Sequence, residues 1–142
     1  MRHIVGLVVL LGCGGDVAVE LQAGDQMSFN TTRIEAVSGQ KVTITLRHTG
    51  QMAKTAMGHN VVILKPDTDV PAFAAAASAA GAANNFIPDA QRDAIIAHTS
   101  LVGGGETTEV TFTAPEPGTY PYVCTFPGHF VAMRGELVVT AP

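Results

Sequence analysis

The chain has 142 residues and a formal net charge of −4 at neutral pH, with 8 Lys and Arg residues against 12 Asp and Glu residues. A chain of this length predicts a single domain. Its mild acidity and the lack of a basic cluster argue against nucleic acid as a partner.

The first twelve residues have the features of a signal peptide. A short basic start, Met1–His3, precedes an apolar run that is too short to span a membrane. The run ends in Leu10-Leu11-Gly12-Cys13, which resembles the lipobox of bacterial lipoproteins. In that class, cleavage falls before the cysteine and its sulfur receives a diacylglycerol. We therefore expect residues 1–12 to be removed, Cys13 to carry lipid, and residues 13–16 to form a short tether. The alternative is an ordinary core or disulfide cysteine at position 13.

Residues 17–142 show the pattern of short β-strands. The segments that alternate apolar and polar side chains, or that form a more continuous apolar run, are Val17–Leu21, Met27–Phe29, Val42–Leu46, Asn60–Leu64, Thr107–Thr113, Gly118–Cys124 and Gly135–Thr140. Short strands bounded by turns are typical of an antiparallel β-sandwich. We therefore expect one all-β domain over residues 17–142.

One segment departs from this pattern. Pro71–Ala83 is mostly alanine, the best helix former, with proline at its start and Gly81 within it. We expect a short helical flap around residues 72–85, inserted outside the sandwich and held by Phe73 and Phe86. The alternative is a disordered low-complexity insert.

The stretch from Cys124 to Met133 gathers three soft metal ligands. The cysteine, His129 and Met133 lie within ten residues of one another. Pro127-Gly128 predicts a turn that brings the histidine back towards the cysteine. Taken alone, Cys124 would be an ordinary buried cysteine and Met133 an ordinary core residue.

A second histidine lies far upstream in Met57-Gly58-His59-Asn60, which leads into an apolar strand. One Cys, two His and a weak axial Met form the ligand set that holds blue copper. Gly58 lets the backbone approach closely, so that its carbonyl can cap the side opposite the methionine. The expected cofactor is one copper ion, and its candidate ligands are Gly58 (carbonyl), His59, Cys124, His129 and Met133.

Four motifs, in the same order, resemble the azurins and their relatives the auracyanins: Gly24–Asn30, Met57–Asn60, Ile95–Leu101 and Cys124–His129. The resemblance runs from about Val17 to Thr140. It implies the cupredoxin fold, which is an eight-stranded Greek-key β-sandwich, with the five ligands named above.

The same resemblance implies further roles near the metal. The backbone N–H groups of Asn60 and Phe126 are expected to hydrogen-bond the sulfur of Cys124, and the Asn60 side chain to tie the two ligand loops together. His48 matches a buried histidine that need not bind metal, and His98 matches a surface histidine.

These residues predict an electron carrier rather than an enzyme. With Met133 on one side of the metal and Gly58 on the other, no open position remains for a substrate. We expect Cu(I)/Cu(II) cycling that shuttles single electrons in the periplasm or cell envelope, on a membrane held through lipid on Cys13. One alternative is a copper-binding or buffering protein of the same fold. Another is an enzyme with Cys124 as nucleophile and His129 as base, which leaves His59 unexplained.

Redox partners are expected to dock at an apolar patch around His129. Its residues are Met27, Met52, Met57, Phe126 and Pro127, with Val131 beside them. A contiguous apolar patch at a redox centre predicts transient docking. The alternative is ordinary packing of the loops.

Overall fold

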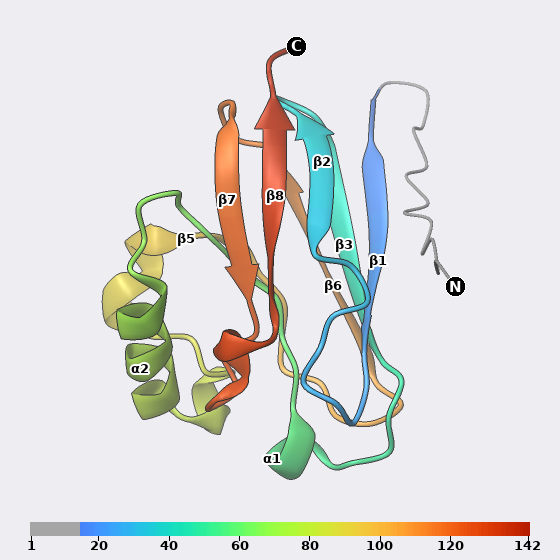
Figure 1. The fold of residues 1–142 in the computed structure, drawn as a ribbon, viewed down its shortest axis with the longest axis vertical. Coiled ribbons are helices and arrows are strands. Elements are labelled where there is room, and N and C mark those ends of the chain that lie inside the picture. The colour runs from blue at the N-terminus through green and yellow to red at the C-terminus, as the bar shows by residue number, and fades with distance from the viewer. Residues whose placement is uncertain (1–14) are drawn as a thin grey trace.

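The computed structural model describes residues 15–142, which form two β-sheets packed face to face (Figure 1). The prediction of an eight-stranded β-sandwich with a short helical insert is confirmed. The predicted signal peptide and Cys13 lie outside the described residues. Within residues 15–142, no helix has the length and apolar character needed to cross a membrane.

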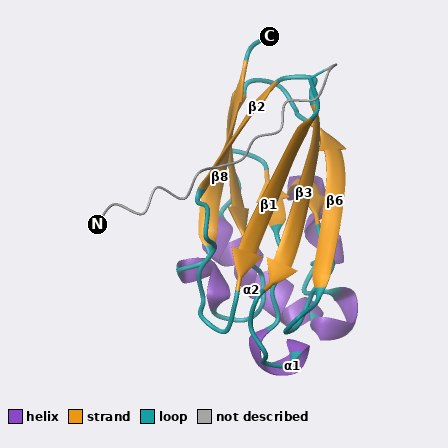
Figure 2. Cartoon of the chain, turned by 90° about the vertical axis from the view of Figure 1, so that its right-hand side faces the viewer, coloured by secondary structure: helices purple, strands orange, loops and turns teal. Residues whose placement is uncertain are grey.

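The first sheet has three strands in the order β1, β3, β6, which lie side by side in Figure 2. They span Val17–Ala23, Lys41–His48 and Thr107–Thr113. Alternate side chains of β1 and β3 are buried, as their period-two pattern predicts. β3 pairs with β6 antiparallel, but β1 pairs with β3 in parallel.

The second sheet has five strands in the order β2, β8, β7, β4, β5. In that order they span Arg33–Val37, Arg134–Thr140, Gly118–Val123, Val62–Leu64 and Ile95–His98. β2 pairs with β8 in parallel, and the remaining pairs are antiparallel. Two of the strand pairs are therefore parallel, although the turn-bounded strands predicted an antiparallel sandwich. The chain crosses to the opposite sheet at β2 before β3 pairs with β1, and such a crossover permits parallel pairing.

The apolar interior has two parts. The larger part lies between the two sheets, and the smaller part lies between the second sheet and helix α2 (Val70–Ala80). β4 serves both, because Ile63 faces the larger core while Val62 and Leu64 pack with Phe73 of α2. This double burial explains why β4 is a continuous apolar run in the sequence.

The alanine-rich flap is a helix, as expected. The Asp69 side chain caps α2 by accepting a hydrogen bond from the N–H of Ala72, and the helix ends at Gly81, whose φ of 82° lies outside the helical region. The remaining short helices are α1 (Lys54–Met57), η1 (Ala82–Asn84), η2 (Asp89–Ala94) and η3 (His129–Val131). α1 lies at the opposite end of the sandwich from the C-terminus (Figure 1).

One predicted strand is absent from the structure, and two observed strands were not predicted. Met27–Phe29 is a loop, and its alternation reflects only the burial of Phe29 against the ring of Tyr122, at a centroid distance of 5.8 Å. β2 and β5 were missed. Both are short edge strands. β5 is partly buried along its length and leaves no apolar period, whereas β2 does alternate polar and apolar residues over its five positions.

Candidate metal centre

Three potential metal donors converge at one end of the sandwich. Cys124 directly follows β7, His129 begins η3, and His59 lies between α1 and β4. The sulfur of Cys124 lies 3.6 Å from Nδ1 of His129 and 4.0 Å from Nδ1 of His59. All three side chains are buried, and their donor atoms lie within 4.8 Å of one another. The structure therefore brings together residues that are 65 positions apart in the sequence.

The chain forms the predicted turn between Cys124 and His129. Gly128 has a φ of 82°, a left-handed conformation that favours glycine. The N–H of His129 donates to the carbonyl of Phe126 at 3.0 Å, which closes the turn. As a result, the His129 ring points back towards the cysteine, as the Pro-Gly pair predicts.

Met133 and Gly58 complete the surroundings of the sulfur. Met133 is fully buried, and backbone hydrogen bonds join it to both His129 and Cys124. The carbonyl oxygen of Gly58 lies 3.9 Å from the Cys124 sulfur. A Cβ atom on Gly58 would lie 2.6 Å from the carbonyl oxygen of Lys54, so this close approach requires glycine.

The tautomer of His59 follows from its hydrogen bond. Its Nε2 lies 2.6 Å from the carbonyl oxygen of Gly24. A carbonyl only accepts hydrogen bonds, so Nε2 must carry the proton and donate it. Nδ1 of the neutral ring then keeps a free lone pair, and this is the nitrogen that faces the sulfur of Cys124.

His129 lies nearer the surface than His59. Its ring packs against that of Phe126, at a centroid distance of 4.5 Å, and against that of His59 at 5.2 Å. Within residues 15–142, every buried side-chain N or O atom has a hydrogen-bond partner, and none of the described residues pairs with Nε2 of His129. This nitrogen therefore reaches the surface.

Burial keeps all three donor groups uncharged near neutral pH. Burial raises the pKa of the Cys124 thiol to about 11, although the N–H groups of Asn60 and Phe126 hydrogen-bond the sulfur and oppose part of the rise. Burial, with the charge of His59 nearby, lowers the pKa of His129 to about 4. Burial also lowers the pKa of His59. At neutral pH the cage formed by His59, Cys124 and His129 thus holds two neutral imidazoles and one protonated thiol. Once the thiol loses its proton, this soft donor set fits copper.

The two ligand loops are joined by Asn60, as the resemblance implied. Its Oδ1 accepts a hydrogen bond from the N–H of Thr125 at 2.8 Å, and its Nδ2 donates to the hydroxyl of Thr125 at 2.8 Å and to the carbonyl of Asn85 at 3.0 Å. Both Asn60 and Thr125 are buried. Because each follows a donor residue directly, these bonds tie His59 to Cys124.

The two other histidines differ in their relation to the centre. His48 is buried and its ring stacks on that of His59 at a centroid distance of 4.6 Å, as expected for a nearby histidine that is not one of the three donors. His98 is half-buried, less exposed than the surface position expected, and its Nδ1 lies 2.9 Å from the carbonyl oxygen of Thr99.

Sequence reasoning missed two groups beside the centre. The Gly24 carbonyl, which holds His59, is a backbone atom, and no side chain marks its role. Thr125 carried one signal, its position directly after Cys124, but nothing in the sequence shows that it pairs with Asn60.

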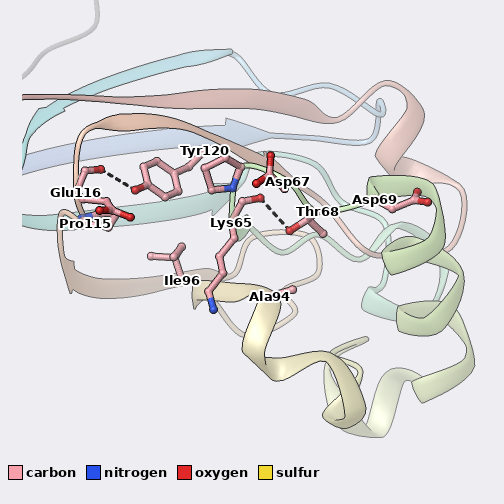
Figure 3. Close-up of a pocket in the computed structure, with 10 residues that line it drawn as sticks. Lys65, Asp67, Thr68, Asp69, Ala94, Ile96, Pro115, Glu116 and Tyr120 are labelled. Atoms are coloured by element: carbon pink, nitrogen blue, oxygen red, sulfur yellow. Dashed lines mark hydrogen bonds between the residues drawn. The ribbon is translucent and has the colours of Figure 1, made fainter.

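A separate cavity of about 570 Å³ lies away from these donors (Figure 3). Lys65, Asp67 and Asp69 line it, together with Glu116 and Tyr120. The Tyr120 hydroxyl donates to the carbonyl of Glu116 at 2.6 Å. Neither cysteine nor histidine lines this cavity, so it is distinct from the metal centre.

Comparisons with known proteins agree with this geometry. A model of the family described as "Copper binding proteins, plastocyanin/azurin family" matches residues 15–140. The chain is 39% identical over 127 residues to auracyanin-A of Chloroflexus aurantiacus, across 88% of this chain and 75% of that protein. The solved structure of auracyanin A, described as a "blue" copper protein, superposes with a TM-score of 0.80 at 38% identity, over 89% of this chain and 100% of that chain.

Two further relatives are similar over most of the chain. Azurin of Alcaligenes faecalis is 42% identical over 123 residues, across 84% of this chain and 94% of that protein. "Outer membrane protein H.8" of Neisseria gonorrhoeae is 38% identical over 129 residues, across 88% of this chain and 68% of that protein.

The family match covers nearly all the described residues, and His59, Cys124, His129 and Met133 are arranged as a type 1 copper site. The chain therefore belongs to the plastocyanin/azurin family of copper-binding proteins, whose azurins and auracyanins are electron carriers and not enzymes.

Proposed function

We propose that the protein is a blue (type 1) copper carrier that shuttles single electrons between redox partners in the cell envelope. The copper would be bound by His59, Cys124, His129 and Met133, with the Gly58 carbonyl as a weak cap. The observation that carries the proposal is the convergence of one sulfur and two imidazole nitrogens within 4.8 Å, on buried side chains. Thiolate and imidazole both suit copper, and a long axial thioether is typical of electron-transfer centres.

Copper bound here would alternate between Cu(II) and Cu(I) as it accepts and donates one electron. The chain's own residues would keep the donor atoms in one arrangement for both states. The Asn60–Thr125 hydrogen bonds join the two ligand loops, and the N–H of Met133 donates to the carbonyl of His129 at 2.8 Å. Because a packed interior resists rearrangement, little motion would accompany each electron transfer.

Electrons would enter and leave at the edge of the His129 ring, whose Nε2 reaches the surface. The large hydrophobic side chains that are exposed within residues 15–142 are Met27, Met52 and Val131, and each belongs to a loop or short helix at the metal end of the sandwich. Together with Met57, Phe126 and Pro127, they support an apolar docking patch around His129. Such a patch suits brief contacts between redox proteins.

We further infer a lipid anchor at Cys13 and a place in the cell envelope. The support is the lipobox-like sequence before Cys13 and the similarity to a protein named as an outer membrane protein. Cys124 is buried among the metal donors, so Cys13 is the cysteine left for lipid. Residues 13–16 would then be a short tether between the membrane and β1.

Adding Cu(II) to the purified protein should produce an intense visible band from charge transfer between the Cys124 thiolate and copper. A reductant should bleach it and an oxidant restore it. Cys124→Ser should abolish the band, and Cys13→Ser, the matched control, should keep it. A colourless complex, or copper that exchanges rapidly with a chelator without reversible one-electron chemistry, would favour copper buffering instead.

Metal binding near neutral pH should release one proton per ion. Between pH 7 and 9 both histidines are neutral, because their pKa values are lowered, while the thiol, with a pKa of about 11, keeps its proton. The apparent affinity for Zn(II) should therefore rise about tenfold per pH unit in this range. Titration calorimetry in buffers of different ionisation enthalpy counts the protons. Cys124→Ser should release none, and two protons from the wild type would show that a histidine is charged.

A charge in the docking patch should slow electron exchange without changing the centre. We expect Met52→Lys or Val131→Lys to slow exchange between oxidised and reduced protein by roughly tenfold, as for loss of a central apolar contact. The visible spectrum should stay unchanged. The control is Thr113→Lys, an exposed position at the far end of β6. Because the chain is acidic, the added positive charge alone would reduce the repulsion between two protein molecules and would not slow their exchange. Equal electron-exchange rates in all the variants would show that docking takes place on another surface.

Lipid attachment can be tested with the two cysteines as mutual controls. In cells given labelled fatty acid, the wild type and Cys124→Ser should carry label and sediment with membranes. Cys13→Ser should lose both the label and the membrane association. Label that persists in Cys13→Ser would contradict the anchor.

A further inference from the structure

The carboxylate of Asp25 joins two loops beside the metal centre. Its Oδ2 accepts a hydrogen bond from the N–H of Gln51 at 2.9 Å, and its Oδ1 accepts one from the N–H of Met52 at 3.0 Å. The first loop leaves the end of β1, and the second leaves the end of β3. Asp25 itself is exposed and is not one of the donor residues.

Gly24 lies between Ala23 and Asp25 in the chain, and its carbonyl accepts a hydrogen bond from Nε2 of His59 at 2.6 Å. On one side of Gly24, the carbonyl of Ala23 accepts a hydrogen bond from the N–H of Thr49 at 2.9 Å. On its other side, Asp25 binds the same 49–52 segment. Gly24 is thus tied down on both sides, which sets the direction of its carbonyl.

The two loops are too close to shift independently. A Cβ atom on Gly50 would clash with Oδ1 of Asp25 and would lie 2.7 Å from the backbone nitrogen of Asp25. A Cβ atom on Gly24 would lie 2.9 Å from the hydroxyl oxygen of Thr49. Glycine at both positions lets the loops approach, and the carboxylate of Asp25 then locks them together.

The second loop is also bonded to the chain that leads into His59. The N–H of Gly50 donates to Nδ1 of His48 at 3.1 Å, so Nε2 of that ring carries the proton and donates to the carbonyl of Met57 at 2.8 Å. Met57 precedes His59 by two residues. The hydrogen bonds therefore form a closed ring. Asp25 connects the loop that is bonded, through His48, to the backbone just before His59 with the loop whose Gly24 carbonyl is bonded to the His59 side chain.

We propose that Asp25 is a positioning residue for the copper centre, which fixes the tautomer and orientation of the His59 ring through the carbonyl of Gly24. This inference rests on the proposed copper function only where it concerns the copper-loaded protein. In the metal-free protein, the same contacts should keep the proton on Nε2 of His59 and leave Nδ1 free. Groups that orient a metal-binding histidine directly commonly change metal affinity by about 10- to 100-fold when lost.

The test compares Asp25→Ala with Asp69→Ala in the full chain. Both changes remove an exposed carboxylate that accepts hydrogen bonds from backbone N–H groups, but Asp69 caps α2 and lines the separate cavity, which no metal donor lines. In metal-free protein, ¹⁵N NMR of the histidine rings reports the His59 tautomer and the rate at which its Nε2 proton exchanges with water. We expect mixed tautomers and roughly tenfold faster exchange in Asp25→Ala, with wild-type behaviour in Asp69→Ala.

The copper-loaded protein gives a second readout. Asp25→Ala should shift the thiolate-to-copper band and release copper to a chelator roughly tenfold faster, while Asp69→Ala should match the wild type. Asp25→Asn keeps one acceptor oxygen, so it should lie between Asp25→Ala and the wild type; it also decides the matter if Asp25→Ala does not fold. An unchanged His59 ring in both Asp25 variants would overturn the proposal. A wild type that forms no blue complex would instead refute the copper function, and the NMR result would still stand.

Discussion

The centre depends on a thiol held in a dry interior opposite two uncharged imidazoles. Burial works against charge at all three groups, since it raises the pKa of Cys124 and lowers those of His59 and His129. Without metal, the cage is therefore close to neutral and can be buried at low cost. The thiolate becomes favourable only when a cation replaces its proton, so the metal must displace that proton, while the two histidines offer lone pairs that carry no proton at neutral pH.

The sandwich positions these groups through a few backbone contacts rather than through the sheets alone. Cys124 directly follows β7 and keeps the direction of that strand, so it faces the larger core together with Tyr120 and Tyr122. His59 comes from an irregular segment, and Asn60 and the Gly24 carbonyl hold it from two sides. The donor set thus rests on hydrogen bonds between loops, which small rearrangements would break. This explains why the loops at this end contain glycines that tolerate no side chain, such as Gly50 and Gly58.

Much of the fold could be predicted from the sequence because most of its strands bury one face and therefore alternate apolar and polar residues. β1, β3, β6 and β8 lie close to where alternation placed them, and β7 ends just before the cysteine. β5 was missed because an edge strand of four partly buried residues carries too little periodicity, and β2 was missed although its five residues alternate polar and apolar side chains. The alternation at Met27–Phe29 was wrongly taken for a strand because a loop residue, Phe29, fills the core.

The parts of the site that are formed by side chains could be predicted from the sequence. Cysteine, histidine and methionine around a Pro-Gly turn have a distinctive chemistry, and a second histidine upstream completes the set. The supports of that set were less visible. A carbonyl such as that of Gly24 has no residue type that marks it, and the bonds of Asp25 join positions 26 and 27 residues apart. Tertiary geometry decides these contacts, and a single sequence does not encode it in any local pattern.

The most direct measurement of the central claim is a crystal structure of the copper-loaded protein, with anomalous scattering recorded at the copper edge. We expect one anomalous peak per chain, bonded to the sulfur of Cys124 and to Nδ1 of both His59 and His129, with Met133 and the Gly58 carbonyl at longer distances on opposite sides. A peak bonded through Nε2 of either histidine, or one outside the Cys124 cage, would contradict the account.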